Sequence, residues 1–236
     1  MPNKRIKTTS MSSIGALVVA LFLGGCAARP PETKPIHHYV LSPAAIHSPK
    51  KADDLRPNIT LAVQFNGPHY LQRTEVVVRQ SPQQLVISDT ERWLGEPIKV
   101  FEQVFRRDLA QHLGIELSLV RVPEPGATRA RTELVTVSGE IIQFDGQLNG
   151  EITLRASWKL EHSIKEPSDS TDHIIYGVEP SSTLTQQGEV KVRVADTGLP
   201  GYDGYVAAMS QALDALAGLV AQDIRKISAP KGTPQE

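Results

Sequence analysis

The stretch ELVTVSGEIIQFDGQLNGEITLRASWKLEHSI, residues 133–164, decides the fold class. Apolar and polar side chains alternate in its second half, so that one face would carry Ile152, Leu154, Ala156, Trp158 and Leu160. The segment GQLNG between the halves has a glycine at each end, which is typical of a hairpin turn. The pattern therefore predicts two long strands, 133–146 and from 151 onward, with one face turned to a core.

Further strands are predicted on either side of this hairpin. β-branched and apolar runs favour strands at 36–42, 58–65, 115–122 and 188–196. A second hairpin is expected from EVVVR at 75–79 and QLVIS at 84–88, with a turn containing Pro82 between them. Proline suits this turn because it cannot donate a hydrogen bond inside a central strand.

Two helices complete the predicted elements. The first begins at Pro97 and ends at Gly114, with apolar side chains at three- or four-residue steps between them. The second runs from Asp203, the expected N-cap, to about Ile227, and Asp223 interrupts its apolar spacing. We expect one α/β or α+β domain: a mixed sheet of about six to eight strands with two main helices packed on it.

The N-terminus has the layout of a secretory signal peptide. Lys4, Arg5 and Lys7 precede the apolar run IGALVVALFL at 14–23, which is too short to span a hydrocarbon core of about 30 Å. The following LGGC at 23–26 resembles the bacterial lipobox, whose cysteine thiol receives a diacylglyceryl group. Cys26 is the only cysteine in the chain, so no intramolecular disulfide competes for it. The alternative is an ordinary secretion signal with an incidental cysteine.

Lipidation of Cys26 would attach the protein to a membrane. Alanines follow the cysteine, and the absence of an adjacent aspartate favours the outer membrane, periplasmic face, by the sorting rule of enterobacterial lipoproteins. We expect a signal peptide at 1–25, a proline-rich tether at 26–35, the domain at 36–228 and a disordered tail at 229–236.

Composition argues against a nucleic-acid partner. Three of the 25 basic residues lie in the signal segment, so the remainder carries 22 basic and 26 acidic residues, a net charge of −4. The charges are mixed along the chain, without a basic block.

No catalytic or metal-binding motif is present in the sequence. His37 and His38 are adjacent and would point to opposite faces of a strand, and neither HxxxH nor HExxH occurs. Asp108 and His112 are four residues apart on the first helix, but no nucleophile accompanies them, which favours a surface pair. We therefore expect no enzyme, no metal and no cofactor beyond the lipid on Cys26.

Several short runs resemble one known family. They are HYVL at 38–41, YLQR at 70–73, VVVR at 76–79, Leu85, RW at 92–93 and EPI at 96–98. Their order and approximate spacing are similar to those of the ABC-type transport auxiliary lipoproteins. The resemblance implies a non-enzymatic accessory lipoprotein of an MCE/ABC-type or Pqi-type system that moves lipids between membranes. It also implies an MCE-domain protein and an inner-membrane transporter complex as partners, and a homo-oligomeric ring.

The aromatic and arginine side chains of these runs are the residue types that dominate binding surfaces. The candidate partner-binding residues are Tyr39, Tyr70, Leu71, Arg73, Arg92 and Trp93. Trp93 could instead fix the following helix to the sheet, and Arg73 or Arg92 could neutralise a buried carboxylate. Two other functions stay open: a periplasmic carrier with its own lipid pocket, and an envelope hydrolase.

Overall fold

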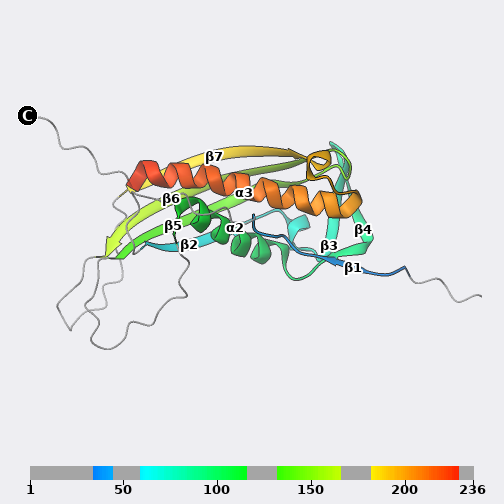
Figure 1. The fold of residues 1–236 in the computed structure, drawn as a ribbon, viewed down its shortest axis with the longest axis horizontal. Helices are drawn as coiled ribbons and strands as arrows, with labels where there is room; N and C mark the ends of the chain where they lie inside the picture. Colours follow the sequence, from blue (N-terminus) through cyan, green and yellow to red (C-terminus); the bar gives the residue numbers. More distant parts are fainter. Residues whose placement is uncertain (1–33, 45–58, 116–131, 166–181, 229–236) are drawn as a thin grey trace, which may run out of the picture. The chain divides into compact units, whose positions relative to one another are not determined.

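The computed structural model describes residues 34–44, 59–115, 132–165 and 182–228. Within these residues seven strands and two α-helices form, together with two short 3-10 helices (Figure 1). The strands are β1 His37–Tyr39, β2 Ile59–Asn66, β3 Glu75–Ser81, β4 Gln84–Trp93, β5 Thr132–Gly146, β6 Glu151–Lys165 and β7 Ser182–Arg193. The helices are η1 His69–Gln72, α2 Pro97–Leu113, η2 Val194–Thr197 and α3 Gly201–Ser228.

The strands are divided between two sheets. The larger sheet has the order β2-β5-β6-β7, with β2 parallel to β5 and the other pairs antiparallel. The smaller sheet has the order β1-β4-β3, with β1 parallel to β4 and β3 antiparallel to it. The predicted mixed α+β class is confirmed, and the domain from Ile36 onward forms one compact unit. The predicted strand at 115–122 lies outside the described residues, apart from Ile115.

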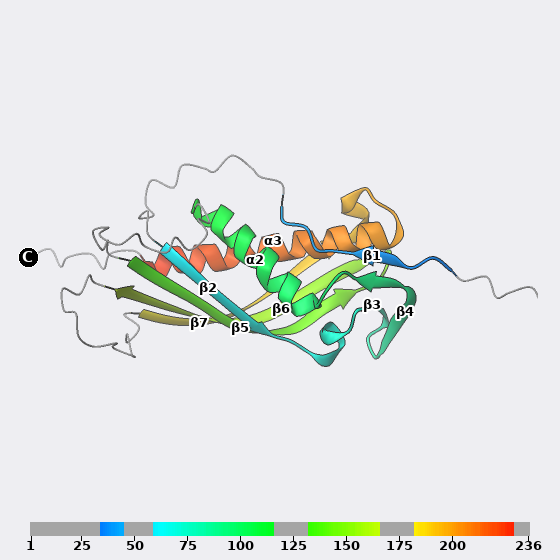
Figure 2. The ribbon, with the colours of Figure 1, turned by 90° about the horizontal axis from the view of Figure 1, so that it is seen from below.

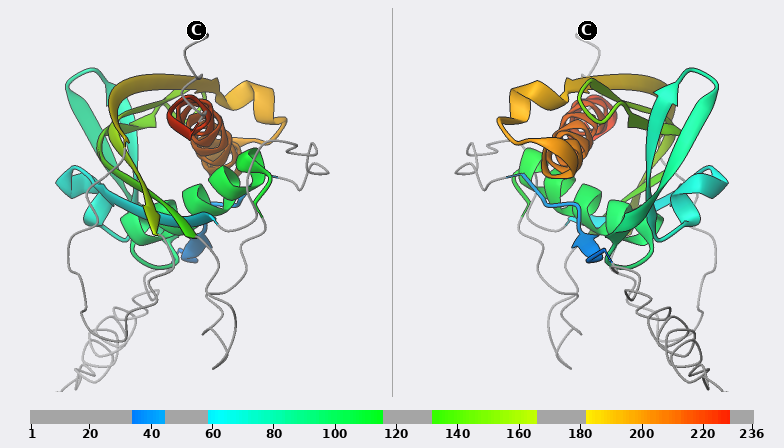
Figure 3. Two further views of the ribbon diagram at one scale, coloured as in Figure 1. Left: turned by 90° about the vertical axis from the view of Figure 1, so that its left-hand side faces the viewer. Right: turned by 90° about the vertical axis from the view of Figure 1, so that its right-hand side faces the viewer.

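Both helices pack on one face of the larger sheet, which curves around them (Figures 2 and 3). The alternating side chains of β6 form the floor of this core: Ile152, Leu154, Ala156, Trp158 and Leu160 are all 3% exposed or less. The opposite face carries surface ion pairs such as Arg155–Glu189. The sequence pattern of β6 thus identified the buried face correctly, because each strand buries alternate residues.

The first helix has the predicted limits. Pro97 occupies the first turn, and Gly114 ends the helix in a left-handed conformation with φ 70°. From this C-cap the Gly114 amide donates to the carbonyls of Ala110 and Gln111. These contacts satisfy carbonyls that the helix itself leaves without partners.

The second helix corrects one prediction. It begins at Gly201, so Asp203 is not the N-cap but lies inside the first turn, where its charge complements the helix dipole. Asp223, which interrupts the apolar spacing, is buried and accepts a hydrogen bond from Trp158 Nε1 at 3.3 Å. Although α3 is long and apolar enough to span a membrane, one whole side of it is buried in the core of this domain.

Candidate functional site

The hairpin β3–β4 and the start of α2 hold most of the family-like runs. Trp93 is the last residue of β4 and pairs in register with Tyr39 of β1. Its side chain is 7% exposed and belongs to the hydrophobic core. Leu71 of η1 is equally buried, at 6%. Both side chains therefore hold the junction between hairpin and helix together, as the packing alternative for Trp93 anticipated.

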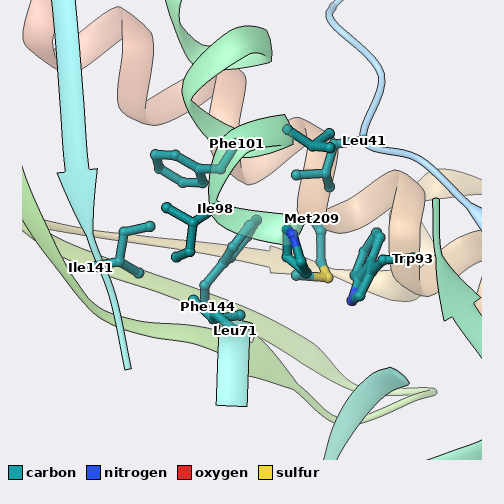
Figure 4. A pocket seen from close by; sticks show the side chains of 10 residues that line it. Leu41, Leu71, Trp93, Ile98, Phe101, Ile141, Phe144 and Met209 are labelled. Atoms are coloured by element: carbon teal, nitrogen blue, oxygen red, sulfur yellow. The ribbon is translucent and has the colours of Figure 1, made fainter. Parts of the chain in front are cut away.

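Trp93 and Leu71 line an apolar cavity beneath this junction. Figure 4 shows them with side chains from the strap after β1 (residues 40–44), from α2, from β5 and from α3, among them Leu41, Phe101 and Met209. The cavity measures about 10 Å³, which is room for about one water molecule. Pockets that bind drug-sized ligands measure about 300–1,000 Å³. This cavity is therefore too small for an acyl chain.

Arg73 and Arg92 lie on the exposed side of the smaller sheet. Arg92 Nη1 lies 2.8 Å from Glu75 Oε1, and Arg73 Nε lies 3.5 Å from Glu75 Oε2. These interactions and a backbone hydrogen bond of Glu75 lower the pKa of its carboxyl, the backbone bond contributing most. The carboxylate that both arginines neutralise is partly exposed, so the three side chains form a charged cluster at the surface.

The hydroxyl groups of Tyr39 and Tyr70 are already engaged. Tyr70 accepts a hydrogen bond from the Phe144 amide at 2.9 Å, and burial raises the pKa of its phenol. The Tyr39 hydroxyl lies against the carboxylates of Glu91 and Asp203, and burial followed by these contacts raises its pKa to about 12. Both rings are partly buried, so each tyrosine links elements within the domain.

A polar network joins the smaller sheet to the larger one. Arg79 of β3 binds Asp145 of β5 through two nitrogens, with Nη2 2.9 Å from Oδ2, and Asp145 is fully buried. The hydroxyl of Tyr205, also fully buried, donates to the Val77 carbonyl at 2.8 Å. Sequence reasoning placed Arg79 in a family-like run without assigning it a role. The signal for Asp145 was an acidic residue directly after Phe144, at the end of a long strand with partial alternation.

Asp108 and His112 do not form the surface pair that their spacing indicated. Asp108 is fully buried and accepts a hydrogen bond from the Ala44 amide at 3.0 Å. His112 instead contacts Asp214 of α3, with Nε2 2.8 Å from Oδ1. The neighbouring helix and the strap after β1 supply these partners, which a helix considered alone cannot reveal.

An open groove runs between the end of β2, η1 and the first turn of α2. It measures about 480 Å³, and it is lined by Phe65, Asn66, Gly67, Leu71, Gln72, Glu96, Ile98 and Lys99. Leu71 and Ile98 form part of its apolar floor, and the polar rim carries Gln72, Glu96 and Lys99, all exposed. Of the predicted partner-binding residues, Leu71 lies here, and none of the polar rim residues was among them.

Metal binding finds no support in the described part of the chain. Across those residues no three His, Cys, Asp or Glu side chains are grouped closely enough to hold an ion. His37 contacts Glu91 through Nδ1 at 3.2 Å, while His38 stands in register with Arg92. Cys26 lies outside the described residues.

Two solved structures are similar to this chain. One crystal structure of an uncharacterized protein is 16% identical, with a TM-score of 0.55, and the match covers 81% of this chain and 99% of that one. A protein from Xanthomonas campestris is 14% identical, with a TM-score of 0.47, covering 78% of this chain and 92% of that one. No curated protein matches the sequence.

A family model matches residues 39–221, well over half of the chain. Its description is the ABC-type transport auxiliary lipoprotein component. The matched range begins at Tyr39 of β1 and ends within α3, so it includes both sheets and both helices. The chain belongs to the family of ABC-type transport auxiliary lipoproteins.

Proposed function

We propose that this protein is a non-enzymatic, lipid-anchored accessory subunit of an MCE/ABC-type or Pqi-type lipid transport system. It is held by the lipid on Cys26 at the periplasmic face of the outer membrane and docks the MCE-domain protein there. The observation that carries the proposal is the family match over 39–221, which makes the chain a transport auxiliary component. The LGGC run at 23–26 supports the anchor.

The groove between β2, η1 and α2 is the docking surface that we assign. Its apolar floor and polar rim have the composition of a protein-binding surface, in which apolar contacts are surrounded by polar side chains. It also gathers parts of two family-like runs, since Leu71 and Gln72 come from one and Glu96 and Ile98 from another. An extended or helical segment of the partner would lie along it.

Docking explains the molecule better than the two alternatives. A lipid carrier needs an enclosed apolar cavity, and the apolar cavity that the described residues form under Trp93 measures only about 10 Å³. A hydrolase needs a base beside a nucleophile. Asp108 and His112, the residues considered for that role, are each bound to other groups.

Affinity capture with matched variants tests the docking surface. The MCE-domain protein from the same organism is the bait, and the full-length lipoprotein in detergent is the prey. We expect Gln72→Trp and Lys99→Glu to reduce capture at least tenfold, because they fill the groove or reverse a rim charge. The controls Gln187→Trp and Lys191→Glu change exposed residues of β7, and Lys191, like Lys99, pairs with a glutamate.

Two results would count against the proposal in different ways. Equal capture of the groove variants and the controls would show that the docking surface lies outside the groove. If the unaltered protein is not captured, and deletion of its gene leaves the cell envelope unchanged, the MCE-domain protein is refuted as the partner.

A further inference from the structure

Large aliphatic side chains are exposed around β1. Ile36 and Val40 flank the strand, and Leu94 follows β4 directly. Their exposed fractions are 56%, 46% and 63%. The Leu94 amide donates to the Tyr39 carbonyl at 2.8 Å, which places Leu94 beside β1. Contiguous exposed apolar patches are uncommon on soluble monomers, and they mark interaction sites.

Basic side chains stand beside these aliphatic ones. His38 is in register with Arg92, and Glu91 and Trp93 on either side of Arg92 are buried. Because side chains alternate along a strand, His38 and Arg92 point away from the core. Arg73 joins Arg92 around Glu75, so two arginines share one carboxylate. We call this surface the β1 face: Ile36, His38, Val40, Arg73, Glu75, Arg92 and Leu94.

The β1 face lies where the domain is joined to its predicted anchor. β1 pairs with β4, the central strand of the smaller sheet, at one end of the domain (Figure 2). Ile36 is ten residues from Cys26 in the sequence. Ten residues span at most about 35 Å when fully extended. A lipid on Cys26 would therefore keep β1 within a few nanometres of the bilayer.

We propose that the β1 face rests on the phospholipid surface that holds the anchor. The aliphatic side chains enter the boundary between headgroups and acyl chains, and Arg73 and Arg92 bind lipid phosphates. The contact rests on the proposed lipidation of Cys26, which raises the local concentration of the bilayer at this face. It would fix one orientation of the domain relative to the bilayer.

A fluorescent probe on Leu94 tests the contact. If Cys26 carries the lipid, the Leu94→Cys variant has a single free thiol for an environment-sensitive dye. The lipidated protein is reconstituted into vesicles of phosphatidylethanolamine and phosphatidylglycerol. We expect the emission to rise severalfold and to be quenched by lipids that carry a nitroxide. The matched control is Gln187→Cys, an exposed position of β7 on the outer face of the larger sheet, which should show neither effect.

A second variant tests the surface itself. Ile36→Glu combined with Leu94→Cys should lower the membrane response of the probe severalfold, whereas Thr185→Glu with Leu94→Cys should leave it unchanged. Equal emission from Leu94→Cys and Gln187→Cys would overturn the proposal. So would a response that appears only when an MCE-domain protein is added, since the β1 face would then bind protein.

The anchor and the face can be judged separately. Intact mass reports whether Cys26 is lipidated. If it is not, the anchor is refuted, and the response of the Leu94 probe to added vesicles, measured in a Cys26→Ser background, still decides whether the face binds lipid.

Discussion

Asp108 is a buried carboxyl group whose environment raises its pKa to about 6, mainly through burial. The Ala44 amide that donates to Oδ1 opposes the shift, and Asp214 adds to it. His112 and Arg107 oppose it from the same helix. Within the described residues, Oδ2 has no hydrogen-bond partner. The fold therefore favours the protonated form, although the same residue holds the strap after β1 against α2.

This shift predicts that stability changes with pH in a definite direction. The pKa of Asp108 is raised from 3.8 in the unfolded chain to about 6 in the folded protein. Its contribution to the free energy of unfolding is therefore complete below pH 4. It is lost as the pH rises through 6. From this group alone, the folded protein should be about 1 kcal/mol more stable at pH 5 than at pH 7.5.

Urea unfolding of the unaltered protein and of Asp108→Asn at these two pH values measures the effect. We expect the difference between the two pH values to shrink by about 1 kcal/mol in Asp108→Asn. The exposed Asp196→Asn is the control, and it should leave the difference as it is. An identical pH dependence in all three proteins would refute the assignment to Asp108.

At the scale of elements, the larger sheet depends on glycines that aromatic rings cover. In the β6–β7 pair, Trp158 packs over Gly188: a Cβ added there would lie 2.7 Å from Trp158 Cη2. In the β2–β5 pair, Phe65 covers Gly139 in the same way, at 2.5 Å from its Cε1. Each ring fills the space that a side chain on the neighbouring strand would otherwise occupy, so the strands can stay in register beneath α2 and α3.

Gly188→Val should therefore displace the Trp158 ring. We expect a loss of about 1–3 kcal/mol in the free energy of unfolding, which is typical of overpacking in a filled core. The near-ultraviolet circular dichroism of tryptophan should change as well. Gln187→Val, the adjacent outward-facing position, is the matched control and should alter neither measurement appreciably. Equal effects at both positions would show that β-propensity, not packing, governs this strand.

For the whole molecule, the central prediction concerns Cys26. Cys26→Ser removes the thiol that would carry the lipid but changes nothing in the described domain. We expect this variant to fold with unchanged thermal stability and to leave the membrane fraction. Membrane fractionation with and without the substitution, together with circular dichroism, checks both statements. Retention in the membrane fraction would show that another part of the molecule provides the anchor.

The sequence by itself determined most of the elements and the buried face of β6, although β7 is Ser182–Arg193 where a strand at 188–196 was predicted. β6 alternates in the sequence as it does in the structure, and Pro97 and Gly114 limit α2, because these features depend on local backbone geometry. The family, too, could be recognised from short runs such as YLQR and RW. The strand at 36–42 was overestimated, since β1 comprises only His37–Tyr39 and its length depends on its pairing with β4.

Only the tertiary structure decided which polar residues meet. Arg79 and Asp145 are 66 residues apart, and Asp108 reaches Ala44 across 64. No periodicity within one element encodes such contacts, because they depend on how sheets and helices pack together. The same holds for Trp93, whose burial depends on β1, α2 and α3 as well as its own strand. Local chemistry thus specified the segments, and long-range packing assigned Trp93 and Leu71 to the core and Arg73 and Arg92 to the surface.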